Sequence, residues 1–211
     1  MDAAVTVFAR KGVEAASISE VTQLAQLSNG SFYYHFRDKA ELVDKVAHAI
    51  AASLVSETDD AIRSVEDGVE RVALATQYLI QLATAEPEWG WLVVRALTDM
   101  GPFHDRISRG IRKDVAIGIE QGRFSVASSN LLFTSLLAVV GVAVRERLEY
   151  PDAPGVERNA AELVLKMLGV SPAKARRLPD EVIERYSESR PPSFRSRKGA
   201  KGNSGLAKGH R

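Results

Sequence analysis

Apolar side chains recur along the chain three and four residues apart, and short Gly, Pro or Ser interruptions separate the periodic segments. This spacing is typical of one face of an α-helix, and the strict alternation of a β-strand is almost absent. The pattern predicts an all-α protein with about nine helices. The expected segments are Ala4–Gly12, Ser17–Ala25, Asn29–Phe36, Asp38–Leu54, Val65–Ala85, Pro87–Thr98, Phe103–Glu120, Ser128–Arg147 and Gly155–Leu168.

Local signals mark the ends of the first helices. Gly12 suits the end of the first one, because glycine adopts the left-handed conformation of a helix C-cap at little cost. Ser17 and Glu20 have the spacing of a capping box, in which each side chain bonds the backbone N–H of the other residue. Asp38 and Glu41 repeat this spacing. These signals predict three short helices followed by a long fourth one.

The chain divides by pattern into three parts. Residues 1–45 hold the short helices. Residues 46–170 hold longer ones, and the helix over 128–147 is apolar on every side, so we expect it to be buried on both faces. Residues 171–211 are rich in Pro, Ser, Gly and basic residues, which predicts a mostly disordered tail with one short helix near Pro179–Glu188.

Charge is distributed unevenly over these parts. The tail carries eleven basic and four acidic residues, whereas the first 170 residues carry 17 basic and 23 acidic ones. The folded body is therefore not a generally basic surface, and binding of nucleic acid would require a local patch. The simplest interpretation of the tail is a solvated segment, and the alternative is a segment that adds non-specific affinity for DNA.

Composition excludes several classes of protein. A chain of 211 residues without cysteine forms no disulfide framework and no thiolate metal site. The longest charge-free stretch, Phe124–Val144, is interrupted by Ser, Asn and Thr and leaves too short an apolar run to span a bilayer. The first residues lack the pattern of a secretory leader. We expect a cytoplasmic protein without membrane association.

The sequence contains no catalytic pattern that we can identify. The histidines lack metal-ligand spacing with carboxylates, and neither a Gly-rich phosphate loop nor a serine nucleophile motif is present. We therefore expect no metal, no cofactor and no enzymatic activity. The histidines are His35, His48, His104 and His210.

The first three helices have the layout of a helix-turn-helix. In this motif the second helix of the pair lies in the DNA major groove, and its N-terminal residues meet base edges. The segment Ser28–Phe36, which contains the third predicted helix, is rich in small donors and aromatic hydroxyls that bond phosphates and bases without adding charge. Phe32 and Phe36 are the expected core residues of the unit.

The segment from Ala3 to Leu42 resembles the N-terminal DNA-binding domain of the TetR family of bacterial transcriptional regulators. The resemblance implies that residues 1–45 form the DNA-binding domain and that residues 46–170 form a helical sensor and dimerisation domain. It also implies a homodimer, a small-molecule effector and a palindromic operator. The residues that carry the resemblance are Ala3, Ala4, Phe8, Gly12, Ser17, Ile18, Val21, Ala25, the run Leu27–Phe36, Lys39 and Leu42.

The resemblance also implies roles for individual residues in binding double-stranded DNA. Ser28 and Asn29 would meet a phosphate at the start of the reading helix, where Asn29 can also pair with a base. Ser31 would face base edges, and Tyr33 and His35 would reach phosphates. The remaining positions are Ser17 and Lys39 for phosphates, Gly30 for close approach of either the helices or the DNA backbone, and Tyr34 for either packing or a phosphate.

Two positions depart from the family pattern. Gln26 occupies the turn where the family usually has Gly, so the turn is made without the residue that adopts positive φ most cheaply. Met1 falls inside the first helix of the pattern, and we expect several native residues to precede it.

The second domain suggests a dimer interface and a ligand pocket. Two apolar helices could form a four-helix contact across a two-fold axis, and the alternative is a deeply buried monomer core. Aromatic and polar residues of the central helices could line a cavity, and the alternative is that they fill the core. The interface residues are Leu132, Leu136, Val140, Val144, Leu163 and Met167, and the pocket residues are Tyr78, Trp89, Trp91, Arg95, Met100, Phe103 and His104.

These observations lead to one function and one alternative. The first is a homodimeric repressor that binds a palindromic operator and is released by a small apolar or aromatic molecule. The alternative is a helical adaptor that binds a protein partner and carries a non-functional DNA reader. Salt-dependent DNA binding distinguishes the two, because only the first should show it.

Overall fold

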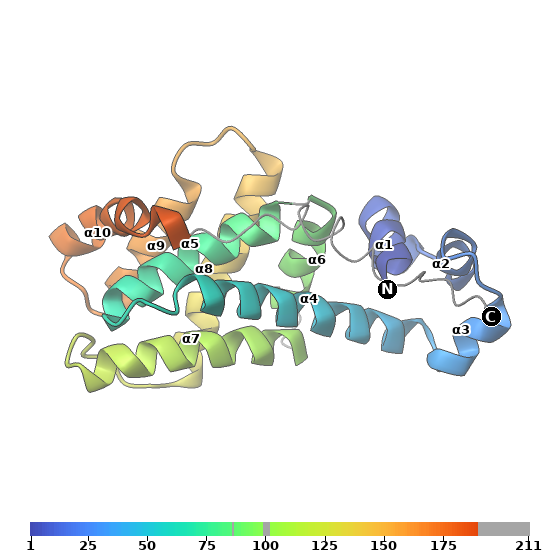
Figure 1. Cartoon of the computed structure of the whole chain (residues 1–211), viewed down its shortest axis with the longest axis horizontal. Coiled ribbons are helices and arrows are strands. Elements are labelled where there is room, and N and C mark those ends of the chain that lie inside the picture. The colour runs from blue at the N-terminus through green and yellow to red at the C-terminus, as the bar shows by residue number, and fades with distance from the viewer. Residues whose placement is uncertain (86, 99–101, 190–211) are drawn as a thin grey trace, which may run out of the picture.

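The computed structural model describes residues 1–85, 87–98 and 102–189, without the side chains at positions 9, 88, 89, 95, 96, 98, 102–106 and 189. Within these ranges every regular element is helical (Figure 1). The elements are α1 (Asp2–Ala15), α2 (Ile18–Leu24), α3 (Asn29–His35), α4 (Lys39–Ala61), α5 (Gly68–Thr84), α6 (Pro87–Thr98), α7 (Pro102–Glu120), α8 (Asn130–Glu149), α9 (Val156–Met167), α10 (Pro172–Arg185) and a 3-10 turn, η1 (Ser187–Ser189).

The predicted caps form in the structure. The N–H of Glu20 donates to Ser17 Oγ at 3.2 Å and the N–H of Ser17 donates to Glu20 Oε2 at 3.0 Å, which completes the capping box of α2. Asp38 accepts the N–H of Glu41 at 2.8 Å before α4. Gly12 has φ +79° and interrupts the helical conformation of α1, as expected of the residue that ends this helix.

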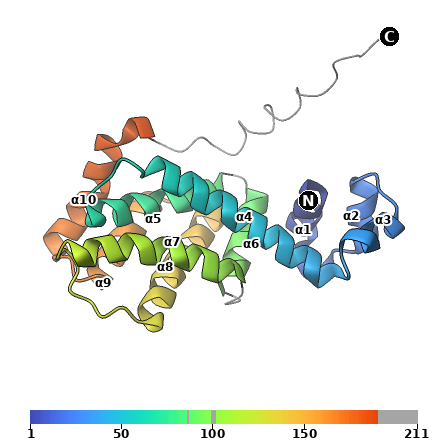
Figure 2. The ribbon, with the colours of Figure 1, turned by 60° about the horizontal axis from the view of Figure 1, so that its bottom comes forward.

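The helices form a small head and a larger second unit. The head contains α1, α2 and α3, and it lies at one end of α4, while α5 and α7–α10 gather around the other end (Figures 1 and 2). With 23 residues, α4 is about 35 Å long, so one helix extends from the head into the second unit. The head meets the second unit at another place as well, because α1 packs against α6.

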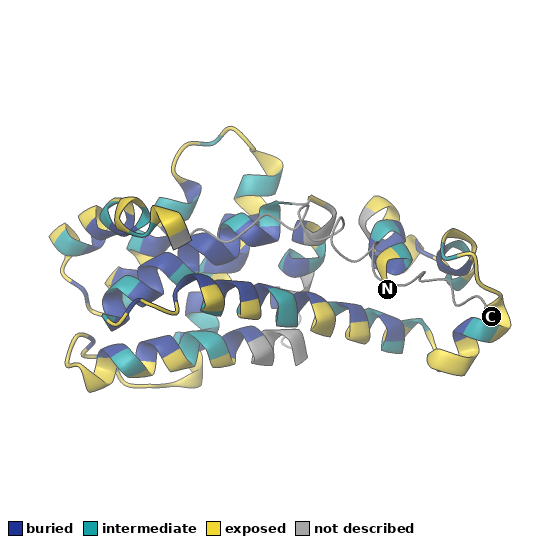
Figure 3. Cartoon of the chain, viewed as in Figure 1, coloured by how far each residue is buried: buried dark blue, intermediate teal, exposed yellow. Residues whose placement is uncertain are grey.

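The most deeply buried helix of the second unit is α5, which contacts every other helix from α4 to α10. Most of its residues are buried (Figure 3), including three polar ones. Arg71 pairs with Asp114 of α7, and the Gln77 amide donates to the carbonyl of Pro179 at 3.1 Å. The sequence predicts that the helix over 128–147 is buried on both faces. Within the single chain α8 keeps one exposed face, with Leu131 78% and Val142 65% exposed.

The prediction that a mostly disordered tail starts at residue 171 is wrong for its first part. Helix α10 begins at Pro172, well before the expected short helix, and Pro179 lies inside it. Ala175, Leu178 and Val182 are buried against α5 and α9, so the helix belongs to the second domain. Burial of this apolar face outweighs the helix-breaking proline and the high charge that dominated the sequence pattern.

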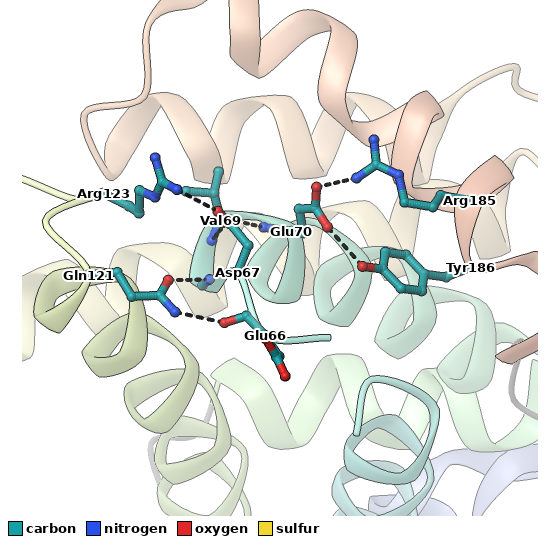
Figure 4. Close-up of polar contacts among 9 residues, drawn as sticks. Glu66, Asp67, Val69, Glu70, Gln121, Arg123, Arg185 and Tyr186 are labelled. Carbon is teal, nitrogen blue, oxygen red and sulfur yellow. Dashed lines mark hydrogen bonds and ion pairs between the residues drawn. The ribbon is translucent and has the colours of Figure 1, made fainter. Parts of the chain in front are cut away.

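Polar contacts hold the end of α10 and the end of α7 against the start of α5 (Figure 4). The Tyr186 hydroxyl donates to Glu70 Oε2 at 3.0 Å, and Arg185 pairs with the other oxygen of Glu70. Gln121 bonds the backbone on both sides of Asp67, since it accepts the N–H of Gly68 and donates to the carbonyl of Glu66, both at 2.8 Å. The first turn of α5 therefore contacts the ends of both α7 and α10.

Candidate functional site

The head forms the predicted helix-turn-helix. Phe32, on the inner face of α3, is buried, and Phe36 is half-buried. The centroids of the two rings lie 5.3 Å apart. Ser28 caps α3 by accepting the N–H of Ser31 at 3.1 Å. Gln26 lies in the turn with φ +57°, which is the left-handed conformation that the missing glycine would have adopted. Phe32 therefore anchors the inner face of α3, and α3 lies at one end of the molecule (Figure 1).

The residues expected to contact DNA lie mostly on the outer surface of α3 (Figure 3). Tyr33 is 60% exposed and Tyr34 is 85% exposed, so Tyr34 does not pack in the core. Ser31 is half-buried, and its hydroxyl lies 3.1 Å from that of Ser28. The other exposed members of the set are Ser17, Ser28, Asn29, Gly30 and His35.

Two of these residues also hold the head together. The Thr22 hydroxyl donates to Asn29 Oδ1 at 2.8 Å, which ties α3 to α2 and leaves the Asn29 amide nitrogen for another partner. The Lys39 ammonium donates to the carbonyls of Glu14 and Ala16, each at 2.9 Å. Sequence reasoning assigned Lys39 to a phosphate, but in this structure two of its three donors bind the end of α1. In this structure Lys39 therefore links the first turn of α4 to the end of α1.

Charge on the head is largely balanced within the head. Lys11 pairs with Glu20, while Arg37 and Lys45 both pair with Glu41. Hydrogen bonds from Lys11 and Ser17 lower the pKa of Glu20 to about 2, and those from the Arg37 backbone and Lys45 lower the pKa of Glu41 to about 2. Both carboxylates remain ionised at neutral pH, so neutral donors rather than net positive charge dominate the surface of α3.

The second unit contains a cavity between α4, α5, α7, α8 and α9. It has about 540 Å³ of empty space, part of it open to solvent. Its described lining is mostly aliphatic, and the polar exceptions are Thr58, Asp59, Thr76 and Asp114. The aliphatic lining residues are Val55, Val72, Ala75, Leu79, Ile107, Ile111, Leu136, Val140 and Val164, with Gly110.

The described residues do not support the aromatic pocket that the sequence suggested. Tyr78 is buried in the core, where its hydroxyl donates to the carbonyl of Tyr186 at 3.2 Å, and Trp91 is 43% exposed. Neither side chain lines the cavity. The prediction for Tyr78 and Trp91 rested on residue type, because periodicity does not show whether a ring faces a cavity, the core or solvent. The side chains of Trp89, Arg95, Met100, Phe103 and His104 lie outside the described part of the chain.

Sequence reasoning missed Asp114, which lies in the wall of the cavity. The sequence feature that could have indicated it is an acidic residue on a helix face that is otherwise formed by Ile107, Ile111 and Val115. Arg71 Nε and Nη2 each lie 2.8 Å from Asp114 Oδ1. Burial raises the pKa of the Asp114 carboxyl, and the Arg71 guanidinium opposes that rise.

The exposed apolar face of the second unit differs from the predicted interface. Leu136, Val140 and Val144 are buried in the core of their own chain, so they are not available to a partner. Leu132 and Met167 are half-buried, and Leu163 is 51% exposed. The apolar residues that α8 and α9 present to solvent are Leu131, Ala138, Val142 and Leu163.

Two family models match the chain. One, described as bacterial regulatory proteins of the tetR family, matches residues 1–46, and the other, described as a tetracyclin repressor-like C-terminal domain, matches residues 67–185. The second model alone covers more than half of the chain and includes α10. The chain belongs to the TetR family.

Individual relatives agree with this membership. The TetR-family chain is 28% identical over 72 residues to the transcriptional repressor KstR2 of Mycobacterium tuberculosis, covering 34% of this chain and 36% of KstR2. It is 29% identical over 79 residues to the A-factor receptor protein of Streptomyces griseus, covering 37% and 29% of the two chains. The matches thus span about a third of the length of these curated relatives.

Solved structures show the same architecture. RolR in complex with resorcinol aligns with a TM-score of 0.69 and 26% identity over 84% of this chain and 89% of RolR. FadR from Bacillus subtilis in complex with stearoyl-CoA aligns with a TM-score of 0.63 and 17% identity over 81% and 95% of the two chains, which shows the fold alone.

The TetR family consists of DNA-binding transcriptional regulators, which are not enzymes, and the helix-turn-helix of α2 and α3 lies within the residues that the N-terminal family model matches. In the described ranges, no three His, Asp or Glu side chains are grouped so that they could hold a metal ion. No helix in the part described here is long and apolar enough to cross a membrane.

Proposed function

We propose that the protein is a homodimeric repressor that binds a palindromic operator and is released by a small, largely apolar molecule. The observation that carries this proposal is the continuity of α4. Its first turn is tied to the head through Lys39, and near its other end Val55, Thr58 and Asp59 line the cavity. A change in the cavity can therefore move the DNA reader through a single rigid element.

The exposed face of α8 and α9 supports the dimer. Leu131, Ala138 and Val142 follow one another at spacings of seven and four residues, which places them along one side of α8. Leu163 of α9 is also exposed. A two-fold contact on this face would present two copies of α3 to successive turns of the DNA major groove, which corresponds to a palindromic site.

The relatives support a small-molecule effector. The TetR proteins aligned above include RolR, whose structure contains resorcinol, and FadR, whose structure contains stearoyl-CoA. The lining of the cavity favours a compact apolar effector for this chain. Because a chromosomal operator lies in the bacterial cytoplasm, we also place the protein there.

Selection of binding sites from a random duplex library tests the DNA-binding part of the proposal. We expect a palindromic site, with salt-dependent affinity that falls about tenfold in Tyr33→Phe, because one hydrogen bond to a phosphate is lost. Tyr150→Phe is the matched control, since Tyr150 is equally exposed but lies at the end of α8. The proposal is contradicted if the selection enriches no sequence, or if both variants lose DNA affinity equally.

Light scattering of a charged variant tests the dimer. We expect Val142→Glu with Leu163→Glu to give monomers, because like charges would meet across the two-fold axis. Ile119→Glu introduces the same charge on the exposed side of α7 and should leave the dimer intact. A dimer that persists in the double variant excludes this face as the interface.

A further inference from the structure

The polar atoms of the cavity are arranged to receive a ligand. Thr58 is only 6% exposed, and its hydroxyl lies buried with no hydrogen-bond partner in the structure. A buried hydroxyl without a partner is destabilising, so it is unusual unless something else binds it. Since Thr58 lines the cavity, a molecule in the cavity is within its reach.

Asp114 provides a second open position in the same wall. Its Oδ1 accepts the Nε–H of Arg71 and lies 2.8 Å from Arg71 Nη2, whereas its Oδ2 accepts no hydrogen bond from the described residues. The residue is 3% exposed and lines the cavity. A carboxylate oxygen accepts hydrogen bonds and donates none when it is ionised, so Oδ2 selects for a donor.

The charges around the cavity are already paired. Arg71 neutralises Asp114, and Lys113 lies 3.7 Å from Asp59 at the edge of the cavity. No Lys, Arg or His is present among the described lining residues. An anionic ligand would approach two carboxylates with no free cation among the described lining residues, and a cationic ligand would compete with Arg71. Either ion would also lose its hydration in the aliphatic pocket.

We propose that the effector is a compact apolar molecule with a neutral hydroxyl group, which donates a hydrogen bond to Asp114 Oδ2 beside the Thr58 hydroxyl. A phenol or an alcohol satisfies these requirements, and a fatty acid, an acyl-CoA or an amine does not. This inference rests on the proposed effector function and specifies its ligand class and its recognition residues.

Titration of the full chain with four matched probes tests the proposal. The probes are 4-ethylphenol, ethylbenzene, 4-ethylbenzoate and 4-ethylbenzylammonium, which share one apolar body and differ in their polar group. We expect 4-ethylphenol to bind at least about tenfold more tightly than each of the others, as one hydrogen bond to a charged acceptor is worth this ratio. Equal or tighter binding of any other probe overturns the proposal, and so does failure of all four to bind.

Two variants test the assigned residues. Thr58→Val keeps the shape of the side chain and should reduce the preference for 4-ethylphenol over ethylbenzene, whereas Thr84→Val, outside the cavity, should not. The double variant Arg71→Met, Asp114→Leu replaces the ion pair by apolar side chains and should abolish the preference. An unchanged preference in both cavity variants overturns the assignment. Operator affinity, measured on the same preparations without probe, tests the DNA-binding function separately.

Discussion

At the scale of single residues, the head shows how a local departure from a family pattern is accommodated. Gln26 occupies the left-handed conformation at φ +57° that glycine adopts without strain. The turn keeps its shape because the packing of Phe32 and the bond between Thr22 and Asn29 fix the helices on both sides. The strain therefore reduces stability and leaves the fold unchanged.

Replacing Gln26 by glycine should stabilise the protein. We expect Gln26→Gly to raise the free energy of unfolding by about 0.5–1 kcal/mol, since relief of the left-handed strain exceeds the entropy cost of glycine. Gln23→Gly, at an exposed position inside α2, should lower it by about 1 kcal/mol. Urea denaturation measures both values. A loss of stability in Gln26→Gly would show that the Gln26 side chain stabilises the turn.

The capping box of α2 predicts a dependence of stability on pH. Hydrogen bonds from Lys11 and Ser17 lower the pKa of Glu20 from 4.5 to about 2. Because the pKa is lower in the folded state, its contribution is full above pH 4.5 and disappears as the pH falls through about 2. We expect Glu20→Gln to be less stable than wild type at pH 7, with a difference that shrinks from pH 4.5 towards pH 2.

Unfolding curves at a series of pH values measure this difference. Glu120→Gln is a suitable control, since Glu120 is exposed at the end of α7 and no described residue bonds its side chain. Its curve should stay close to that of wild type throughout the range. A constant difference between Glu20→Gln and wild type from pH 7 to pH 2 would contradict the role of the Glu20 charge.

At the scale of elements, glycines allow a close contact between α5 and α7 in the second unit. A Cβ atom added to Gly68 of α5 would lie 2.4 Å from the Cα of Gly118 in α7. A Cβ atom added to Gly118 would lie 2.2 Å from the ring of Phe124. This close approach brings the side chain of Gln121 within reach of the backbone at the start of α5.

Substitution at this crossing should be costly, although alanine is the better helix former. We expect Gly118→Ala to lower the free energy of unfolding by about 1–3 kcal/mol, because Phe124 or the backbone has to move. Gly110→Ala in the same helix meets nothing closer than 3.8 Å and should be neutral or stabilising by up to about 1 kcal/mol. Thermal and urea unfolding compare the two, and equal effects would contradict the close contact.

At the scale of the whole molecule, one buried ion pair joins the elements around the cavity. Arg71 of α5 binds Asp114 of α7, and its Nη1 donates to the carbonyls of Ile62 and Val65, just beyond α4, at 3.0 and 2.9 Å. The wall of the cavity is therefore linked to the end of the helix that carries the DNA reader. We infer that this network transmits occupancy of the cavity to α4.

Breaking this pair on one side should be much more damaging than replacing it. We expect Asp114→Leu to lower the free energy of unfolding by about 3–5 kcal/mol, because Arg71 is left as a buried, unpaired charge. The double variant Arg71→Met, Asp114→Leu should recover most of this loss. Urea denaturation of both variants measures the recovery. A double variant no more stable than Asp114→Leu would show that the bonds from Arg71 to Ile62 and Val65 outweigh the ion pair.

The sequence by itself determined most of the helices and the DNA reader. Helix ends depend on side chains within four residues, as at Ser17 and Asp38, and the apolar period persists along each helix. The segment around α3 was recognisable because its residue types and spacing are specific to its family. For Lys39 the structure adds a contact that the sequence did not indicate, since its ammonium binds the end of α1.

Tertiary structure alone decided which apolar surfaces are internal. Leu136 and Val142 are both aliphatic and lie on the same helix, yet Leu136 is buried in its own chain and Val142 faces solvent. Periodicity gives the faces of a helix but not the neighbours that cover them. The same reason applies to α10, whose apolar face matters only against α5 and α9, and to Asp114, which becomes part of a cavity through residues far away in the chain.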